Sequence, residues 1–184
     1  MSGNPDFESP LLAEKHYGRP AVFQVDSMLR ETRRQRSLPE GPVPKMCLLD
    51  PDGDIDPEMI ACTRQRAMFA GIPNIVAELR DVSAEGFGVP DASQEACLLF
   101  NILHCEEPRH LLNEAARVLK HGGKLFVIHW RPDPATPRGP ALEIRPTPRQ
   151  VVDWVSTTRS FENPETPLDL PPWHYGLRFI RRAC

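Results

Sequence analysis

Two short apolar runs with an amphipathic segment between them constrain the fold more than any other feature of this chain. The runs are ACLLFNILH (96–104) and KLFVIHW (124–130). Each is too short for the core of a helix and has the composition of a buried strand in a parallel sheet. Between them, leucine and alanine recur at helical spacing, which predicts a helix from near Pro108 to Gly122-Gly123. A strand–helix–strand unit of this kind predicts a parallel sheet.

The same alternation continues toward the N-terminus. The segment DPEMIACTRQRAMFAG (56–71) has Asp56 in a good N-cap position and proline next to it, which predicts a helix that stops at Gly71. The segment that follows, PNIVAELRD, predicts a short strand over 75–79. Strands and helices therefore alternate at βαβ spacing over 46–130.

The pattern changes beyond Trp130. A long proline-rich connection leads to Thr147-Pro148, which predicts the start of a short helix. Residues 168–182 then predict two antiparallel strands around a turn at Trp173–Gly176. Together these elements predict a three-layer, Rossmann-like α/β fold with a mostly parallel sheet and a C-terminal antiparallel hairpin.

Composition indicates one globular domain preceded by an unusual segment. The chain has 184 residues, 40% of them hydrophobic and 26% charged, which is enough for one domain with a real core. Its 21 prolines crowd into 1–45, 132–148 and 164–172. We therefore expect a proline-rich N-terminal segment over 1–45 with one short helix, and a domain over 46–184.

Charge and cysteine usage argue against several classes of protein. A net charge of −3 gives no general attraction to nucleic acid or anionic membranes. No apolar run approaches the ~20 residues of a membrane span, and the first residues do not resemble a signal peptide. The five cysteines are scattered and form no metal-binding spacing. We expect a cytoplasmic protein without a metal, nucleic-acid or membrane partner.

Three motifs resemble those of class I S-adenosylmethionine-dependent methyltransferases. DIDPEMI (54–60) is similar to the segment that follows the second strand of that family, often D-x-S-P-E-M. Residues 79–104 resemble its third and fourth strands. EAARVLKHGGKLFVIHW (114–130) resembles its E-x-x-R-V-L-K-P-G-G helix and fifth strand, and is the most specific of the three. The resemblance extends over 54–182.

The resemblance implies S-adenosylmethionine as cofactor and assigns residues to it. Asp54, with Ile55 beside it, would end the second strand and bind both ribose hydroxyls, since a carboxylate offers two acceptors to a diol. Asp81 and the backbone of Val82 would bind the adenine amino group. Asn101 would face the methionine part or the substrate. Structural roles stay open for three of them: a turn residue at Asp54, a strand-end cap at Asp81, and an amide satisfied by backbone at Asn101.

The glycine-rich loop of the family is missing. It is usually E/D-x-G-x-G-x-G, and the nearest candidate, CLLDPDGD (47–54), has Gly53 alone. In one interpretation the first strand, loop and first helix are lost. In the other, MCLLD (46–50) is the first strand, DPEMI begins its helix, and PNIVAELRD is the second strand.

A weaker likeness covers the N-terminal part. Residues 9–55 are similar to the opening segment of some nucleoside-phosphorylase-like proteins, and the two likenesses meet at 53–55. That piece has no complete phosphate or nucleoside site, so the phosphorylase activity is not expected.

Two functions follow from the resemblance and its gap. The first is transfer of a methyl group from S-adenosylmethionine to an acceptor, with a small molecule as the first expectation, by in-line displacement. His104 is the candidate general base, although packing is the commoner role for such a histidine. The second is a non-catalytic methyltransferase-like remnant that self-associates through an uncovered sheet edge.

Overall fold

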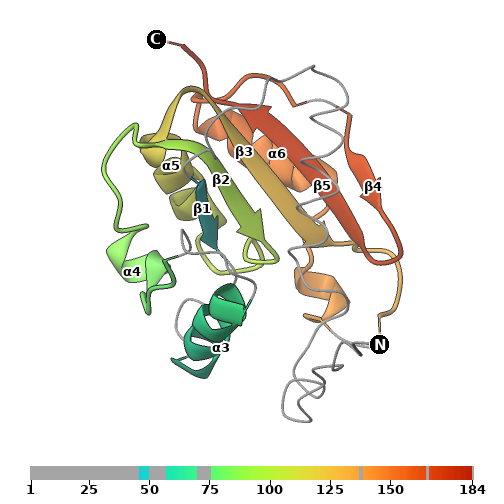
Figure 1. The fold of residues 1–184 in the computed structure, drawn as a ribbon. Coiled ribbons are helices and arrows are strands. Elements are labelled where there is room, and N and C mark those ends of the chain that lie inside the picture. Colours follow the sequence, from blue (N-terminus) through green and yellow to red (C-terminus); the bar gives the residue numbers. More distant parts are fainter. Residues whose placement is uncertain (1–45, 50–56, 70–75, 137–138, 165, 184) are drawn as a thin grey trace, which may run out of the picture. The chain divides into compact units, whose positions relative to one another are not determined.

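A five-stranded sheet in the order β1-β2-β3-β5-β4 is the centre of the computed structural model (Figure 1). The structure describes residues 46–49, 57–69, 76–136, 139–164 and 166–183. Its elements are β1 (Met46–Leu49), α3 (Pro57–Phe69), α4 (Val82–Glu85), β2 (Gln94–Phe100), α5 (Pro108–Val118), β3 (Leu119–Trp130), a short 3-10 helix (Leu142–Ile144), α6 (Pro148–Thr157), β4 (Leu168–Leu170) and β5 (His174–Ile180).

The strand pairing confirms the predicted mixture of parallel and antiparallel strands. β1 pairs with β2, and β2 with β3, in parallel, and Phe100 lies opposite Ile128 in the second pairing. β5 runs antiparallel to both β3 and β4. The turn of this terminal hairpin lies at 171–173, earlier than predicted, because His174 already pairs with Trp130 in the ladder.

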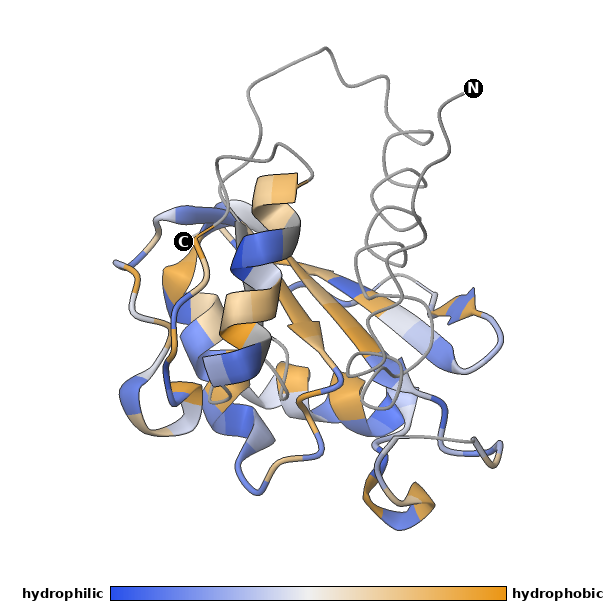
Figure 2. Cartoon of the chain, turned by 60° about the horizontal axis from the view of Figure 1, so that its bottom comes forward, coloured by the Kyte–Doolittle hydropathy of each residue, from blue (hydrophilic) through white to orange (hydrophobic). Residues whose placement is uncertain are grey.

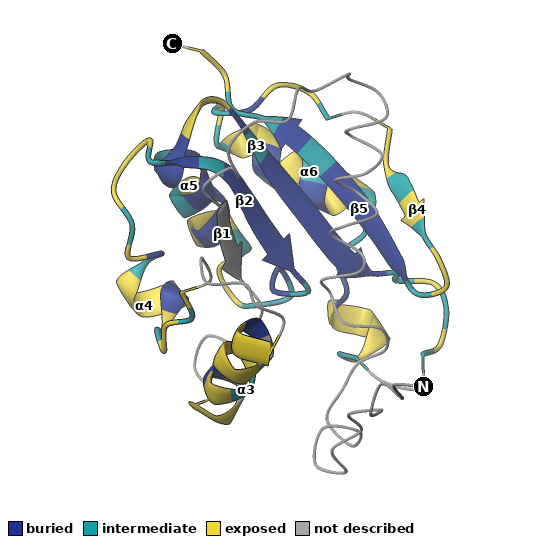
Figure 3. Ribbon diagram, in the orientation of Figure 1, coloured by how far each residue is buried: buried dark blue, intermediate teal, exposed yellow. Residues whose placement is uncertain are grey.

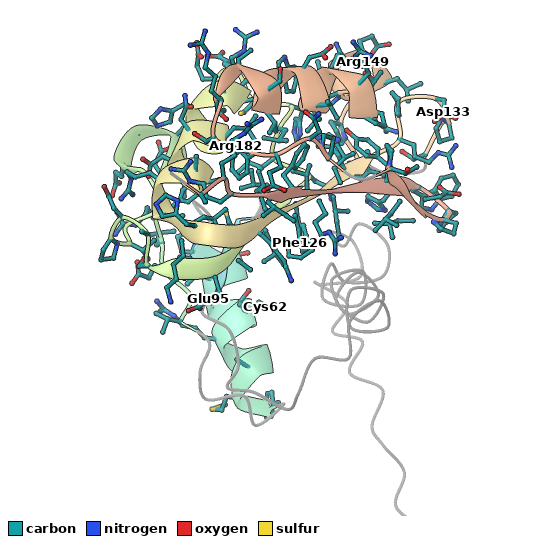
Figure 4. All side chains as sticks on the ribbon, turned by 90° about the horizontal axis from the view of Figure 1, so that it is seen from above. Cys62, Glu95, Phe126, Asp133, Arg149 and Arg182 are labelled. Carbon is teal, nitrogen blue, oxygen red and sulfur yellow. The ribbon has the colours of Figure 1, made fainter. Side chains whose placement is uncertain are left out.

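Both faces of the central strands are buried, as a sheet covered on both sides requires. Successive side chains of a strand point to opposite faces. Leu99, Val127 and Leu177 belong to one core cluster together with residues of α5 and α6. Phe126 is also buried but lies on the side of the sheet opposite α6 (Figure 4). Figure 3 shows the buried colour on β2, β3 and most of β5, and Figure 2 shows the hydrophobic colour on the central strands.

The helix predicted to stop at Gly122-Gly123 ends four residues earlier. α5 stops at Val118, and Leu119 already has the extended backbone of β3. The two glycines belong to the sheet, because the N–H of Gly122 donates to the carbonyl of Arg181 and the N–H of Arg181 donates to Gly123. A Cβ on Gly123 would lie 2.8 Å from the carbonyl oxygen of Lys120, so this position has no room for a side chain.

The strand predicted over 75–79 is not formed at the residues that the structure describes. Residues 76–80 have no regular structure. The carbonyl of Ala77 accepts hydrogen bonds from the guanidinium of Arg64 in α3, at 3.0 and 2.6 Å, and not from a neighbouring strand. Val76 and Leu79 are 82% and 55% exposed. Apolar residues that face solvent on this segment explain why the β-type composition misled the prediction.

β1 occupies the place of a first strand. In a doubly wound sheet the first strand lies beside the fourth, and the resemblance had assigned β2 as the fourth. Met46–Leu49 pairs directly with β2, and α3 is the next described element. This order agrees with the alternative interpretation of MCLLD and DPEMI. The second strand of that interpretation is absent from 76–79, and the predicted strand end at 53–55 lies outside the described residues.

The start of α6 follows the prediction at Thr147-Pro148. The Thr147 hydroxyl accepts from the N–H of Gln150, and the Gln150 side chain accepts from the N–H of Thr147. This capping box satisfies two N–H groups at the helix start. Within the described part of the chain, no helix is long and apolar enough to cross a membrane.

A pair of leucine substitutions tests the buried core and the segment 76–80, where the predicted strand is not formed. Leu112 on α5 is fully buried, so Leu112→Ala should lower the free energy of unfolding by about 2–5 kcal/mol. Leu79→Ala removes the same atoms from an exposed position and should change the free energy of unfolding by less than about 0.5 kcal/mol. Urea unfolding of both variants measures this. A large loss for Leu79→Ala would place 76–80 in a buried strand after all.

Candidate functional site

The carboxyl ends of the parallel strands define the edge where this fold can hold a ligand. β1, β2 and β3 run parallel, so their carboxyl ends meet at one edge of the sheet. Open α/β sheets bind ligands in the crevice outside this edge. The residues that follow the three strands are Asp50, Asn101 and Arg131. Asp54 and Ile55 belong to the connection after β1, which lies outside the described residues.

Asn101 has the backbone and the side chain of a ligand contact. Its φ is 52°, in the left-handed region that asparagine tolerates better than most residues. Its N–H donates to the carbonyl of Ile128 at 2.8 Å, which attaches it to β3. Its Oδ1 is shielded from solvent and has no hydrogen-bond partner among the described residues. Buried polar atoms in this state are rare, so the oxygen is a candidate contact for a ligand.

A cluster of aromatic polar side chains lies next to Asn101. The ring of His129, on β3, is 5.6 Å from the ring of His104 and 6.3 Å from that of Tyr175. His129 is fully buried, whereas His104 is partly exposed. The Tyr175 hydroxyl donates to the carbonyl of Pro146 at 2.7 Å. The sequence singled out His104 as a candidate base and not His129. The place of His129 near the end of a predicted strand was the signal that could have identified it.

Burial keeps His129 neutral. Loss of solvent, and to a smaller extent the nearby His104, lowers the pKa of His129 to about 3. Burial likewise raises the pKa of the Tyr175 hydroxyl above its usual value. Within this cluster only His104 is both partly exposed and close to the strand ends, which keeps it as the candidate for proton transfer.

Asp81 caps a helix in the structure. Its Oδ1 accepts from the N–H groups of Ser83 and Ala84, at 3.0 and 3.1 Å, at the start of α4. The predicted strand-end cap is thus a helix N-cap, since no strand precedes it. Val82 is buried in the same core cluster as Leu103, which follows Asn101 closely in the chain.

Arg145 holds the proline-rich connection after β3, and sequence reasoning missed it. Its guanidinium is only 6% exposed and donates to the carbonyls of Pro140 and Arg131 and to the hydroxyl of Thr136, at 2.9, 3.2 and 2.7 Å. It also lies 5.5 Å from the ring centroid of Trp130. A single arginine in a proline-rich segment gives no sequence signal for this role, because its partners are mostly backbone atoms.

The part of the chain that the structure describes contains no group of three or more histidine, cysteine, aspartate or glutamate residues placed to hold a metal ion.

Comparisons with known proteins found similarity to methyltransferases. Residues 52–127 match a family model described as a methyltransferase domain. A putative type 11 methyltransferase from Sulfolobus solfataricus is similar over 76% of this chain and 86% of its own, with 26% identity and a TM-score of 0.54. A SAM-dependent methyltransferase from Aquifex aeolicus matches 74% of this chain and 68% of its own, with 18% identity and a TM-score of 0.61.

One further neighbour shows the same fold under another name. The [4+2]-cyclase SpnF is similar over 92% of this chain and 86% of its own, with 15% identity and a TM-score of 0.65. A search of curated proteins found no match to the sequence.

The buried histidines predict a loss of stability in acid. An unfolded histidine takes up a proton near pH 6.5, whereas the pKa is about 3 for His129 and about 4 for His174 in the folded chain. Between pH 6.5 and these lower pKa values, the unfolded state therefore binds more protons than the folded state. The free energy of unfolding should fall from pH 6.5 to pH 4 by up to about 1.4 kcal/mol per pH unit for each histidine.

Urea unfolding at a series of pH values measures this slope. His129→Phe and His174→Phe should each remove one histidine's share of it. A slope that is the same in His129→Phe would show that His129 takes up its proton in the folded state.

Proposed function

Because residues 52–127 match a methyltransferase domain and solved methyltransferases share the fold, we propose that the chain binds S-adenosylmethionine at the carboxyl edge of the sheet and transfers its methyl group to a small-molecule acceptor. The observation that supports this most directly is the Oδ1 atom of Asn101, a shielded acceptor at the end of β2 without a partner among the described residues. A bound ligand at this edge would satisfy it, and an unsatisfied buried polar atom otherwise costs about 1–3 kcal/mol.

The cofactor contacts follow the family resemblance. Asp54 and Ile55, which the resemblance assigns to the ribose, belong to the connection that follows β1 in the sequence. The second oxygen of Asp81 and the N–H of Val82 would bind the adenine amino group and ring, while Oδ1 of Asp81 continues to cap α4. A carboxylate has enough lone pairs for both tasks. Asn101 would meet the methionine part of the cofactor or the acceptor.

Methyl transfer needs mainly orientation. The acceptor nucleophile attacks the methyl carbon in line with the carbon–sulfur bond, that bond breaks, and the demethylated cofactor leaves. Holding the two partners in line supplies most of the acceleration. His104, partly exposed beside His129, would take the proton from the acceptor as it is methylated.

Cofactor binding by the full chain tests this proposal. Isothermal titration calorimetry with S-adenosylmethionine and with the demethylated product should show saturable binding. Asp81→Ser keeps an oxygen for the helix cap but lacks the second carboxylate oxygen, so affinity should fall about tenfold, or about 1.4 kcal/mol. Asp153→Ser on α6 is the matched control and should bind normally. Absence of heat at millimolar cofactor would overturn the proposal.

A non-catalytic interaction module is the second candidate. Two features favour it: the connection after β1 contains only Gly53, and β1 is the outermost of the described strands on its side of the sheet. An edge strand with free backbone groups can pair with another chain. If this function holds, light scattering should show a dimer that grows with concentration. A monomer at every concentration, together with cofactor binding, would exclude it.

A further inference from the structure

Two shielded hydrogen-bonding atoms belong to neighbouring residues at the carboxyl edge of the sheet. They are Oδ1 of Asn101 and Nε2 of His129, and neither has a hydrogen-bond partner in the described part of the chain. The register pairs Phe100 with Ile128, and the N–H of Asn101 donates to the carbonyl of Ile128. The two residues that follow this pair are therefore neighbours on adjacent strands. Two such atoms together are unusual in a native protein.

Both atoms are acceptors. The Nδ1 atom of His129 lies 3.4 Å from the carbonyl oxygen of Trp130, and a carbonyl can only accept, so we place the ring proton on Nδ1. Nε2 then carries a lone pair. Burial lowers the pKa of His129 to about 3, so the ring stays neutral and Nε2 stays an acceptor at physiological pH. The amide oxygen of Asn101 also accepts.

The donors of two nearby side chains, Tyr175 and Arg145, are already in use. The only hydroxyl proton of Tyr175, whose ring lies beside that of His129, goes to the carbonyl of Pro146. The guanidinium of Arg145 donates to the proline-rich connection after β3. Two acceptors without a donor call for a group that brings its own hydrogen.

We propose that Asn101 and His129 bind the nucleophile of the methyl acceptor, and that this nucleophile is a hydroxyl or an amine and not a carboxylate. This inference rests on the proposed methyltransferase function. A primary amine supplies an N–H donor to each atom and a hydroxyl supplies its one O–H to either atom, whereas a carboxylate would face two lone pairs. Such a site is selective, because a ligand without hydrogen-bond donors leaves the buried polar atoms unpaired and therefore binds more weakly.

The chemical step balances with these groups. The oxygen or nitrogen of the acceptor forms a bond to the methyl carbon as the carbon–sulfur bond of the sulfonium breaks, and the electron pair stays on sulfur. An amine loses one proton to His104 or to solvent and keeps an N–H on the site; a hydroxyl loses its single proton, the one that the site had held, to the same acceptors. His129 holds the nucleophile by its lone pair and keeps its own proton on Nδ1 throughout.

Nitrogen NMR of the histidine rings in the full-length chain tests the proposal. The probes are benzyl alcohol, benzylamine and benzoate, which share one ring and differ in the group they present. We expect the Nε2 resonance of His129 to be that of an unprotonated nitrogen and to move with the alcohol and the amine but not with benzoate. The spectra are recorded with and without the demethylated cofactor.

Two phenylalanine substitutions separate binding from folding. His129→Phe should weaken binding of the alcohol and the amine at least about tenfold, the value of a hydrogen bond or more. It should not destabilise the free chain at neutral pH, since it removes an unpaired buried polar atom. His174→Phe is the matched control, because His174 is a similarly buried histidine whose ring packs on Trp130, on the other face of the sheet.

Several results would overturn the inference. One is a response of His129 to benzoate, another is equal binding of the alcohol by His129→Phe, and a third is a protonated Nε2, as the other tautomer would give. Failure of the proposed function looks different. Calorimetry would then show no cofactor binding, while the His129 resonance would still respond to the alcohol and the amine.

Discussion

The parallel pairing of β2 with β3 is the constraint on which the rest of the structure depends. It buries both faces of the two strands, and it fixes Phe100 opposite Ile128. That register decides which residues come next at the carboxyl edge, where Asn101 and His129 become neighbours. A shift by one residue would move these side chains to the opposite face. The core and the candidate site are thus set by the same ladder of hydrogen bonds.

The site combines features that cost stability with others that compensate for them. The buried histidine and the unpaired amide oxygen each lower the free energy of unfolding, and the left-handed backbone of Asn101 adds strain. Around them, residues such as Leu99 and Val127 pack into one apolar cluster with α5 and α6. Such a division, with a rigid apolar support below a polar edge, is typical of α/β folds that bind ligands, and it supports a binding role for this edge.

Sequence patterns predicted what depends on local composition and failed where long-range contacts decide. The apolar runs and the Thr147-Pro148 cap predicted β2, β3 and the start of α6 correctly, because burial and capping are local signals. The strand over 75–79 was wrong because nothing in its composition shows that Ala77 bonds to an arginine side chain instead of a strand. Asn101 could be chosen from its place after a strand. His129 has the same kind of place at a strand end, but its proximity to Asn101 could not be predicted, because that proximity depends on the register.

Arg145 has a consequence for how this domain can diverge. It holds the connection after β3 largely through carbonyl oxygens, with Thr136 as the one side-chain acceptor. Carbonyl groups are present whatever the side chain, so most positions of this connection can change without loss of the bonds that hold it. The side chains of this connection are therefore free to vary in chemistry while the backbone path that follows β3 is kept, and the sheet beside it need not change.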